Sequence, residues 1–361
     1  MKILIVSRSF YPLNTPRSFR TTELAKEFVR LGHEVVLCIP ESDFDYSVFI
    51  KEYPLFIKYY KQKTDRKKFV NIPILDRIIY HYEQWLIDYP SLISMKEVEK
   101  TVFNEKGYDL LVTIAVPHYI HWAVGKLYEK GHKIAKTWIA DCGDPFMLTG
   151  VVKKPPFWFK PLEKRWCRLC NYISVPTDTS YQGYYPEFKG KIRVIPQGFS
   201  FEDIVLPEYE KNEIPTFAFA GSLIKDIRDP NCLLEWLTTI KTPFRFLAYG
   251  NNVRQFFEPY QNKLGDKLVI NDPIPRSQLL PVLAKMDFLI NIGNGTKVQT
   301  PSKLIDYTLA KRPIITIETN DIKETVLKEF LAGDYSHKDE PIDISRYDIH
   351  NVAQQFLQLC K

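Results

Sequence analysis

The segment TPSKLIDY, Thr300 to Tyr307, combines residue types that could bind an anion. It follows the apolar run DFLINIG and precedes TLAKRPIITI. Thr300 is a good N-cap residue and Pro301 suits the first helical position, so the segment predicts the start of a helix. Ser302 and Lys303 would lie in its first turn, where free backbone N–H groups and the helix dipole attract negative charge.

Asp306 adds a second function to this candidate site. It lies three residues after Lys303, so the two side chains would share one face of the helix. A carboxylate can accept two hydrogen bonds from a vicinal diol, such as that of a ribose. The segment therefore predicts a nucleoside diphosphate site. An ordinary capped helix with a Lys–Asp surface pair is the alternative, and the residues alone leave both open.

A second cationic segment, FAFAGSLIKDIRDP, starts as a predicted strand. Gly221 and Ser222 would lie at the C-terminal end of that strand, where ligands bind in open α/β sheets. Lys225 and Arg228 follow on the loop. Two cations would offset the charge of a pyrophosphate, and Arg228 could bind it in a bidentate manner. Ordinary solvated loop charges are the alternative.

The N-terminal half also carries polar residues at predicted strand ends. VPHYIHWA contains His118 and His121, which one helix face could present together, although an isolated His is more often structural. WIADCGDPF ends the next strand with Asp141 and Asp144, and a carboxylate there could orient a hydroxyl group. DCGD is a weak candidate for metal binding. We expect no metal and no cofactor.

Short apolar runs alternate with helical patterns along the chain, which predicts parallel sheets. The first series is KILIV, EVVLC, DLLVTIA, KTWIAD, YISVP and KIRVIP, and the second is TFAFAG, FRFLAYG, KLVIND, DFLINIG and PIITI. A chain of 361 residues is long enough for two domains. We expect α/β domains over residues 1–197 and 198–341, and a terminal helix within 342–361 that could pack back on the first domain.

Residues 41–100 interrupt this alternation. The segment is basic and aromatic, with helical periodicity in parts. It predicts an inserted helical pair packed on the first domain. A basic, aromatic, amphipathic surface also suits an anionic membrane interface, so both interpretations stay open.

The composition favours a globular cytoplasmic protein and excludes several classes. Hydrophobic residues make up 45% and charged residues 25% of the chain. The first apolar run is too short for a signal peptide or a membrane span. A net charge of +6 without a recognition motif disfavours nucleic-acid binding, and the lack of G-x-G-x-x-G after the first strand disfavours a nicotinamide dehydrogenase. The six scattered cysteines indicate reduced thiols.

Together these motifs resemble the GT-B glycosyltransferases, specifically the retaining family 4 type. The C-terminal half contributes FAFAGSL, DPIPRSQLLPVLAKMDFLINIG and PSKLIDYTLAKRPII, and the N-terminal half contributes KILIVSRSFYP, TELAKEFVRLGHEVVL, WIADCGDPF and KIRVIPQGF. The resemblance implies two Rossmann-like domains that face each other across a cleft. It implies an acceptor site on the first domain and a nucleotide-sugar site on the second.

The resemblance also implies roles for individual residues. The catalytic set would be Arg228, Lys303, His118 and Asp144. The donor site would be formed by Gly221, Ser222, Lys225, Ile274, Pro301, Ser302, Leu304 and Asp306. An acceptor or a phosphate would contact Arg17, Arg20 and Asp141. The sequence departs from the family pattern at Val298, where the first Glu of the usual pair would fall, and in PLNTPRSFR, which replaces a glycine-rich loop.

The implied activity is retaining transfer of a sugar from a nucleoside diphosphate donor, with a UDP-sugar favoured, to a saccharide on a lipid carrier in surface-polysaccharide synthesis. In front-face transfer the leaving diphosphate can take the acceptor proton, so the enzyme mainly stabilises the departing charge. Peripheral contact with the inner face of the membrane would fit this activity. Two alternatives stay open: a sugar-nucleotide epimerase of the same fold, and a binding protein without catalysis, which Val298 favours.

Overall fold

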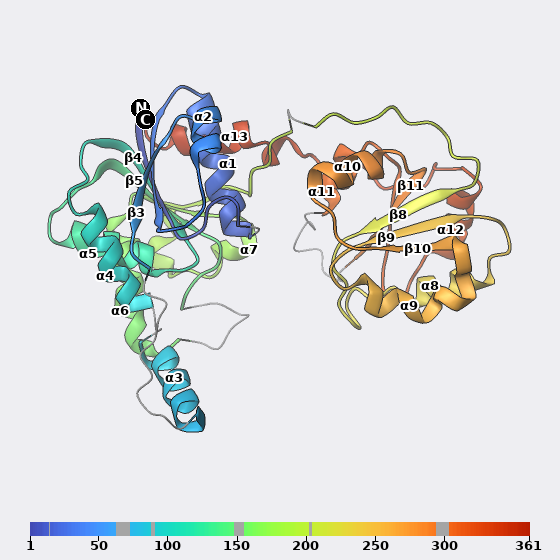
Figure 1. Cartoon of the computed structure of the whole chain (residues 1–361), viewed down its shortest axis with the longest axis horizontal. Helices are drawn as coiled ribbons and strands as arrows, with labels where there is room; N and C mark the ends of the chain where they lie inside the picture. The colour runs from blue at the N-terminus through green and yellow to red at the C-terminus, as the bar shows by residue number, and fades with distance from the viewer. Residues whose placement is uncertain (14, 63–72, 88–90, 148–154, 202–203, 294–302) are drawn as a thin grey trace. The chain divides into compact units, whose positions relative to one another are not determined.

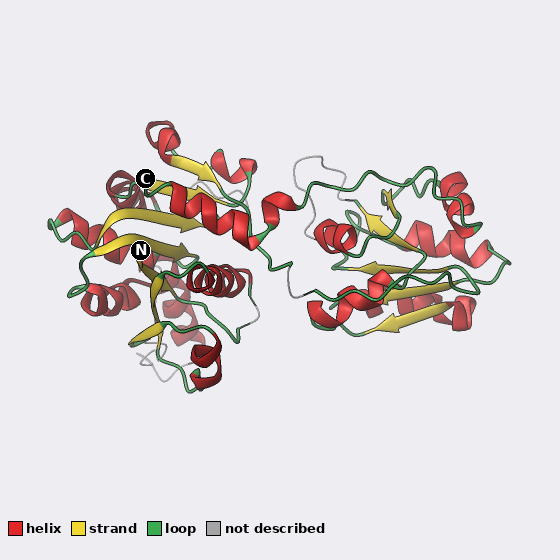
Figure 2. Ribbon diagram, turned by 90° about the horizontal axis from the view of Figure 1, so that it is seen from above, coloured by secondary structure: helices red, strands yellow, loops and turns green. Residues whose placement is uncertain are grey.

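The computed structural model describes residues 1–361 except 14, 63–72, 88–90, 148–154, 202–203 and 294–302 (Figure 1). The chain divides into two compact units. Unit 1 comprises Met1–Phe201 and Ser345–Lys361, and unit 2 comprises Glu202–Ile344. In each unit, helices pack on both faces of one parallel sheet (Figure 2). The expected α/β fold with two sheets is therefore confirmed.

The sheet of unit 1 has the strand order β3-β2-β1-β4-β5-β6-β7, and all its pairings are parallel. The strands are β1 (Lys2–Ser7), β2 (Glu34–Pro40), β3 (Phe56–Tyr60), β4 (Tyr108–Ala115), β5 (Ala135–Cys142), β6 (Tyr172–Val175) and β7 (Ile192–Val194). The central strands are apolar throughout because helices bury both faces of the sheet. The strand order reverses between β1 and β4, which defines the topological switch point of this unit.

The helices of unit 1 are α1 (Pro16–Arg30), α2 (Ser47–Glu52), α3 (Pro73–Ile87), α4 (Ser91–Val102), α5 (Tyr119–Glu129), α6 (Lys160–Leu169), α7 (Asp178–Tyr181) and α13 (Ile349–Gln358). One core lies between the sheet and α4, α5 and α6. On the other face, Val352 and Phe356 of α13 join Leu24 and Phe28 of α1 in a second core. The terminal helix packs on the first domain, as expected.

The insert at residues 41–100 contains a strand as well as helices. The strand β3 pairs with β2 and forms an edge of the sheet. Its sequence FIKYY has no continuous apolar run because Lys58 interrupts it. Phe56 and Tyr59, on either side of Lys58, are exposed. The sequence pattern therefore indicated only a helical pair here, which corresponds to α3 and α4.

Unit 2 has the strand order β10-β9-β8-β11-β12, again with parallel pairings. Its strands are β8 (Thr216–Ala220), β9 (Arg245–Tyr249), β10 (Leu268–Asn271), β11 (Phe288–Ile292) and β12 (Ile314–Ile317). Its helices are α8 (Asn231–Thr239), α9 (Val253–Leu264), α10 (Arg276–Ala284), α11 (Lys303–Leu309) and α12 (Glu324–Leu331). The order reverses between β8 and β11, so the switch point lies at their carboxyl ends.

We find no helix among the described residues that is long and apolar enough to cross a membrane.

Candidate functional site

Three strands of unit 2 are followed by glycines at their carboxyl ends. Gly221 follows β8, Gly250 follows β9 and Gly293 follows β11. Gly221 and Gly250 have φ values of +152° and +157°, which favour glycine, and a Cβ on Gly250 would lie 2.1 Å from the carbonyl oxygen of Gly221. A Cβ on Gly293 would lie 2.3 Å from a carboxylate oxygen of Glu318. Of these three glycines, only Gly221 was predicted from the sequence to lie at the site.

Two buried side chains of α11 fix the helix against these strand ends. The hydroxyl group of Tyr307 accepts a hydrogen bond from the Ala220 N–H at 2.8 Å and lies 3.1 Å from the carbonyl oxygen of Ile290. The Nζ of Lys303 donates to the carbonyl oxygen of Ile292 at 2.9 Å. These contacts place the Lys303 ammonium group at the switch point between β8 and β11.

Lys303 is a buried cation with a second cation nearby. Only 9% of the residue is exposed, and Nζ lies 4.9 Å from the centre of the Phe219 ring. Burial lowers the pKa of Lys303 to about 7, and repulsion by Arg228 contributes to the shift. Within the described part of the chain, Lys303 forms no ion pair. A bound anion would supply the missing negative charge.

The loop after β8 holds Arg228 beside this position. The side chain of Asn252 holds the loop through two hydrogen bonds. Its Oδ1 accepts from the Leu223 N–H at 3.1 Å, and its Nδ2 donates to the Leu223 carbonyl at 2.7 Å. Arg228 Nη1 donates to the carbonyl oxygen of Ser222 at 3.0 Å. Lys225 is exposed on the same loop, as is Ser222. Arg228 thus lies close enough to Lys303 to lower its pKa, and the role of the two side chains in a phosphate site stays a prediction.

Asp306 has a partner that the sequence analysis missed. Nε of Arg276 lies 2.6 Å from Oδ1 of Asp306. Burial raises the pKa of Asp306, and the ion pair with Arg276 opposes that shift. Ile274 and Leu304 are partly buried against the core that contains Tyr307. The sequence did offer one signal for Arg276: it follows Pro275 at the first position of a predicted helix.

Several residues of the predicted site lie outside the described residues. They are Thr300, Pro301, Ser302 and Val298. The helix start proposed for Thr300 therefore stays a prediction, and the described part of α11 begins at Lys303.

In unit 1, Arg20 and Asp141 form a buried ion pair. Arg20 Nη2 lies 2.8 Å from Asp141 Oδ1, and Nε donates to Oδ2 at 3.2 Å. Arg20 also donates to the carbonyl groups of Ile195 and Pro196. Burial opposes ionisation of Asp141, but Arg20 and Arg17 outweigh it and lower its pKa. Arg20 belongs to α1, so its hydrogen bonds join α1 to β5 and to the segment after β7. Arg20 and Asp141 could contact an acceptor or a phosphate only if this ion pair opened.

Arg17, His118 and Asp144 lie near the carboxyl ends of β4 and β5. The Arg17 side chain is 19% exposed and its Nη1 lies 3.5 Å from Asp141. Asp144 is exposed. His118 is buried, and burial lowers its pKa to about 4, although a hydrogen bond with the backbone of Asp144 opposes the shift. Its Nδ1 has no hydrogen-bond partner among the described residues. His118 is therefore neutral at pH 7.

Three buried side chains offer the ligand atoms for a metal ion. Those of His118, His121 and Cys142 all lie within 4.8 Å of one another. His121 already has partners, since Nδ1 lies 2.8 Å from the hydroxyl group of Thr113 and Nε2 lies 3.2 Å from Cys142 Sγ. Burial raises the pKa of Cys142 well above its usual value, so the protonated thiol can donate to His121. These hydrogen bonds explain why His121 and Cys142 lie close together.

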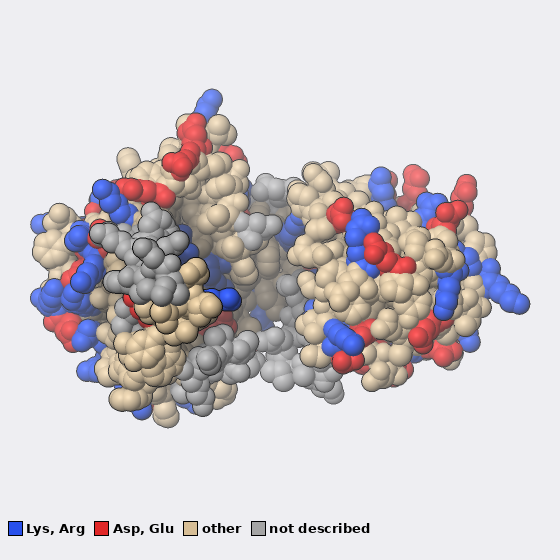
Figure 3. All heavy atoms as spheres, turned by 60° about the horizontal axis from the view of Figure 1, so that its bottom comes forward, with Lys and Arg blue, Asp and Glu red and all other residues tan. Residues whose placement is uncertain are grey.

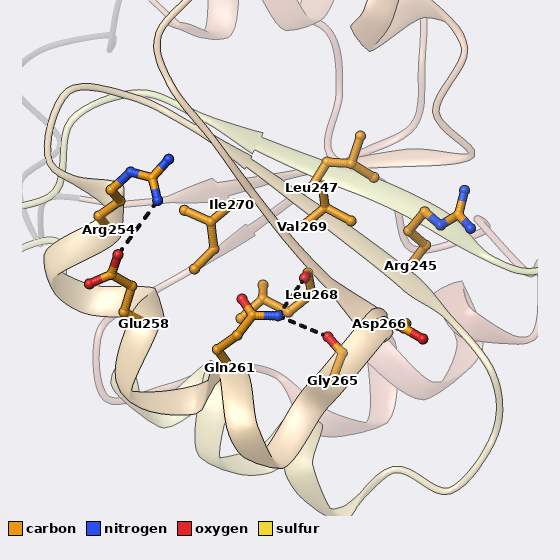
Figure 4. Close-up of a pocket in the computed structure, with 10 residues that line it drawn as sticks. All are labelled: Arg245, Leu247, Arg254, Glu258, Gln261, Gly265, Asp266, Leu268, Val269 and Ile270. Atoms are coloured by element: carbon orange, nitrogen blue, oxygen red, sulfur yellow. Dashed lines mark hydrogen bonds and ion pairs between the residues drawn. The ribbon is translucent and has the colours of Figure 1, made fainter.

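A hollow beside the edge strand β10 contains none of the predicted site residues (Figure 4). Gln261 crosses it and donates to the carbonyl groups of Gly265 and Leu268 at 3.0 and 3.1 Å, and Arg254 pairs with Glu258 at 3.5 Å. The remaining lining residues are Arg245, Leu247, Asp266, Val269 and Ile270. The hollow runs along β10 and is not at the switch point, so we assign no ligand to it.

The sequence matches no protein-family model and no curated protein. Solved structures do resemble the chain. A lipopolysaccharide outer core galactosyltransferase, WaaB, in its apo form, aligns with a TM-score of 0.57 and 12% identity over 99% of both chains. A glycosyltransferase from Rickettsia africae ESF-5 aligns with a TM-score of 0.58 and 14% identity over 100% of this chain and 97% of that chain.

An enzyme of another class has the same architecture. The UDP-GlcNAc 2-epimerase from Neisseria meningitidis, bound to UDP-GlcNAc, aligns with a TM-score of 0.54 and 11% identity over 99% of both chains. Together these similarities establish the fold class: the chain has the GT-B fold, with two Rossmann-like domains.

Proposed function

We propose that this protein is a retaining, metal-independent glycosyltransferase that uses a nucleoside diphosphate sugar, with a UDP-sugar favoured. The observation that carries the proposal is the Lys303 ammonium group, buried beside Arg228 at the switch point of unit 2. A buried cation is costly unless it is paired, and a diphosphate would pair with both side chains. The GT-B fold and the resemblance to a galactosyltransferase support the same interpretation.

The donor site would use the groups around this pair. Gly221 carries no side chain beside Lys303, so a phosphate oxygen could approach the backbone there. Arg276 occupies Oδ1 of Asp306, so we assign Oδ2 to a ribose hydroxyl group. The exposed Lys225 would add positive charge at the edge of the site.

The chemistry we propose needs charge stabilisation more than acid–base catalysis. The bond between the anomeric carbon and the diphosphate oxygen breaks while the acceptor oxygen bonds to the same face of that carbon. The departing phosphate oxygen takes the acceptor proton. Lys303 and Arg228 would stabilise the negative charge that develops on the diphosphate, and a preorganised donor of this kind contributes about 3 to 4 kcal/mol. Donor binding would itself keep Lys303 protonated, because an adjacent anion raises its pKa.

The acceptor site would lie at the strand ends of unit 1. Asp144 is exposed there and could orient the acceptor hydroxyl group, and Arg17 could contact a phosphate. His118 is neutral, so it could offer a hydrogen bond without adding charge. We propose that the acceptor is a saccharide, carried on a lipid in surface-polysaccharide synthesis at the cytoplasmic face of the membrane.

An epimerase is the second candidate, because a UDP-GlcNAc 2-epimerase has the same fold. One experiment separates the candidates: incubate the protein with UDP-sugars, with and without short alkyl glycosides as acceptors, and record NMR spectra of the products. A transferase gives a new glycoside with the anomeric configuration of the donor. An epimerase gives an altered sugar nucleotide without acceptor. A binding protein gives neither product, although UDP raises its melting temperature.

A further inference from the structure

One face of α3 is apolar and exposed. Ile74, Ile78, Tyr82 and Trp85 are 74%, 58%, 58% and 47% exposed, and Leu75 beside them is 45% exposed. With about 3.6 residues per turn, these five side chains fall within one side of the helix. Such a stripe normally faces the core of a soluble protein, whereas here it faces outward. Figure 1 shows α3 extending away from the sheet of unit 1.

The polar residues of α3 follow the reverse arrangement. The helix has two carboxylates, Asp76 and Glu83, and both are half-buried on the side opposite the stripe. Arg77 and His81 are exposed at the margin of the stripe. The exposed side of α3 therefore combines apolar and aromatic groups with one positive charge, that of Arg77. Figure 3, where this end of unit 1 comes forward, shows mostly uncharged atoms on that part of the surface.

A neighbouring segment fixes α3 and enlarges the apolar surface. Trp158 Nε1 donates to the carbonyl oxygen of Leu86 at 2.8 Å, and the rings of Trp158 and Trp85 lie 5.3 Å apart. Phe157, at 5.2 Å from Trp158, is 78% exposed. We name the combined area the α3 surface; it consists of Ile74, Leu75, Ile78, Tyr82, Trp85 and Phe157.

We propose that the α3 surface docks on an anionic lipid bilayer. Aliphatic side chains would enter the acyl boundary, Tyr82 and Trp85 would lie at the level of the headgroups, and Arg77 would meet anionic lipid. In the sequence, KQKTDRKK at residues 61–68 carries five cationic residues and one carboxylate shortly before α3, although 63–68 lie outside the described residues. This charge favours an anionic partner. A symmetric pairing with a second copy would bring like charges together.

This proposal deepens the proposed function, since a lipid-carried acceptor would place the enzyme at a membrane, but binding can be measured without any sugar. The assay is co-sedimentation of the full chain with phosphatidylglycerol vesicles and with phosphatidylcholine vesicles. We expect the protein to bind more strongly to the phosphatidylglycerol vesicles than to the phosphatidylcholine vesicles. Added salt should weaken the binding to phosphatidylglycerol, because it screens the charges.

The variant that tests the surface is the double substitution Ile74→Asp and Ile78→Asp. The matched control is Val48→Asp, because Val48 on α2 is a 76% exposed aliphatic residue of the same unit. We expect the double variant to lower partitioning at least about tenfold, since it removes apolar insertion and adds repulsion, and the control to bind as wild type. No binding by wild type, or equal binding by the double variant, would overturn the proposal.

A second readout locates the contact. Lipids brominated in the acyl chains quench tryptophans that enter the bilayer, and Trp85 is exposed while Trp122, Trp138 and Trp166 are buried. Trp158 packs on Trp85 and is half-buried, so we expect quenching that the tryptophan variant, Trp85→Phe with Trp158→Phe, largely removes. Quenching that persists in the tryptophan variant would point to another surface and contradict the proposal. Light scattering that shows a dimer for wild type and a monomer for the Ile74→Asp and Ile78→Asp variant would also contradict the proposal. A UDP-induced thermal shift tests the donor site separately, so failure of one proposal is distinguishable from failure of the other.

Discussion

Nε of Arg276 lies 2.6 Å from Oδ1 of Asp306, so the carboxylate that we assign to the ribose already has a cationic partner. The pair links the first residue of α10 to α11 within unit 2. Burial favours the protonated acid, and Arg276 favours the carboxylate. Arg276 is therefore a positioning residue in this account: it keeps Asp306 ionised and correctly oriented.

Replacing Arg276 with Ala should weaken UDP binding about tenfold, which corresponds to ~1.4 kcal/mol. Without the guanidinium group, the pKa of Asp306 rises further, so UDP affinity should begin to fall at a higher pH on acidification than it does in wild type. Calorimetric titration with UDP between pH 5 and pH 8 measures both effects. Arg254→Ala is the control, because Arg254 pairs with the exposed carboxylates of Glu258 and Asp272. Equal pH profiles for wild type and Arg276→Ala would refute the positioning role.

Lys303→Met should separate activity from stability. Loss of the ammonium group should lower the transfer rate by about 3 kcal/mol of barrier if Lys303 stabilises the departing diphosphate. The free energy of unfolding should stay equal or increase, because an apolar side chain replaces a buried cation without an ion pair in the described residues. Rate measurements and urea denaturation test the two halves. Lys263→Ala, on the exposed side of α9, should change neither.

Nucleotide binding should take up a proton above neutral pH. Lys303 has a pKa of about 7 without ligand, so at pH 8 a large fraction is deprotonated, and an adjacent diphosphate raises the pKa and recharges it. Below pH 6 the group is already protonated and should contribute no uptake. Titrations at pH 8 in buffers of different ionisation enthalpy measure the proton count, and Lys303→Met should abolish this contribution. A proton count that is unchanged in the variant would contradict the assignment.

Asp141→Asn should destabilise unit 1 by about 3 to 5 kcal/mol, because it leaves the buried Arg20 guanidinium group without its counter-charge. Asp144→Asn is the matched control, because Asp144 is an acidic residue near the end of the same strand but is exposed. Its stability should be close to wild type. Because the pKa of Asp141 is lowered in the folded state, its contribution is present above the unfolded-state pKa and is lost as pH falls through the folded value. Thermal denaturation between pH 3 and pH 7 measures this loss.

The sequence predicted most of the fold because buried parallel strands are apolar on both faces. Runs such as KILIV and DFLINIG correspond to β1 and β11. The edge strand β3 carries exposed aromatic side chains around Lys58, and so its pattern resembled neither a buried strand nor an amphipathic one.

The site was less predictable because partners come together only in the folded chain. The expectation that Lys303 and Asp306 share a helix face could not reveal that one contacts the Ile292 carbonyl and the other contacts Arg276. Likewise, Arg20 and Asp141 are 121 positions apart in the chain, and each alone resembled a ligand-binding residue. Burial of both was invisible to local patterns.

The most direct test of the central claim is the thermal shift that UDP causes without added metal in wild type and in Lys303→Met. We predict that UDP raises the melting temperature of wild type and raises that of the variant much less, because the diphosphate binds at Lys303 and Arg228. The same shift in both proteins, or no shift with any nucleoside diphosphate in wild type, would contradict a donor site at the switch point of unit 2.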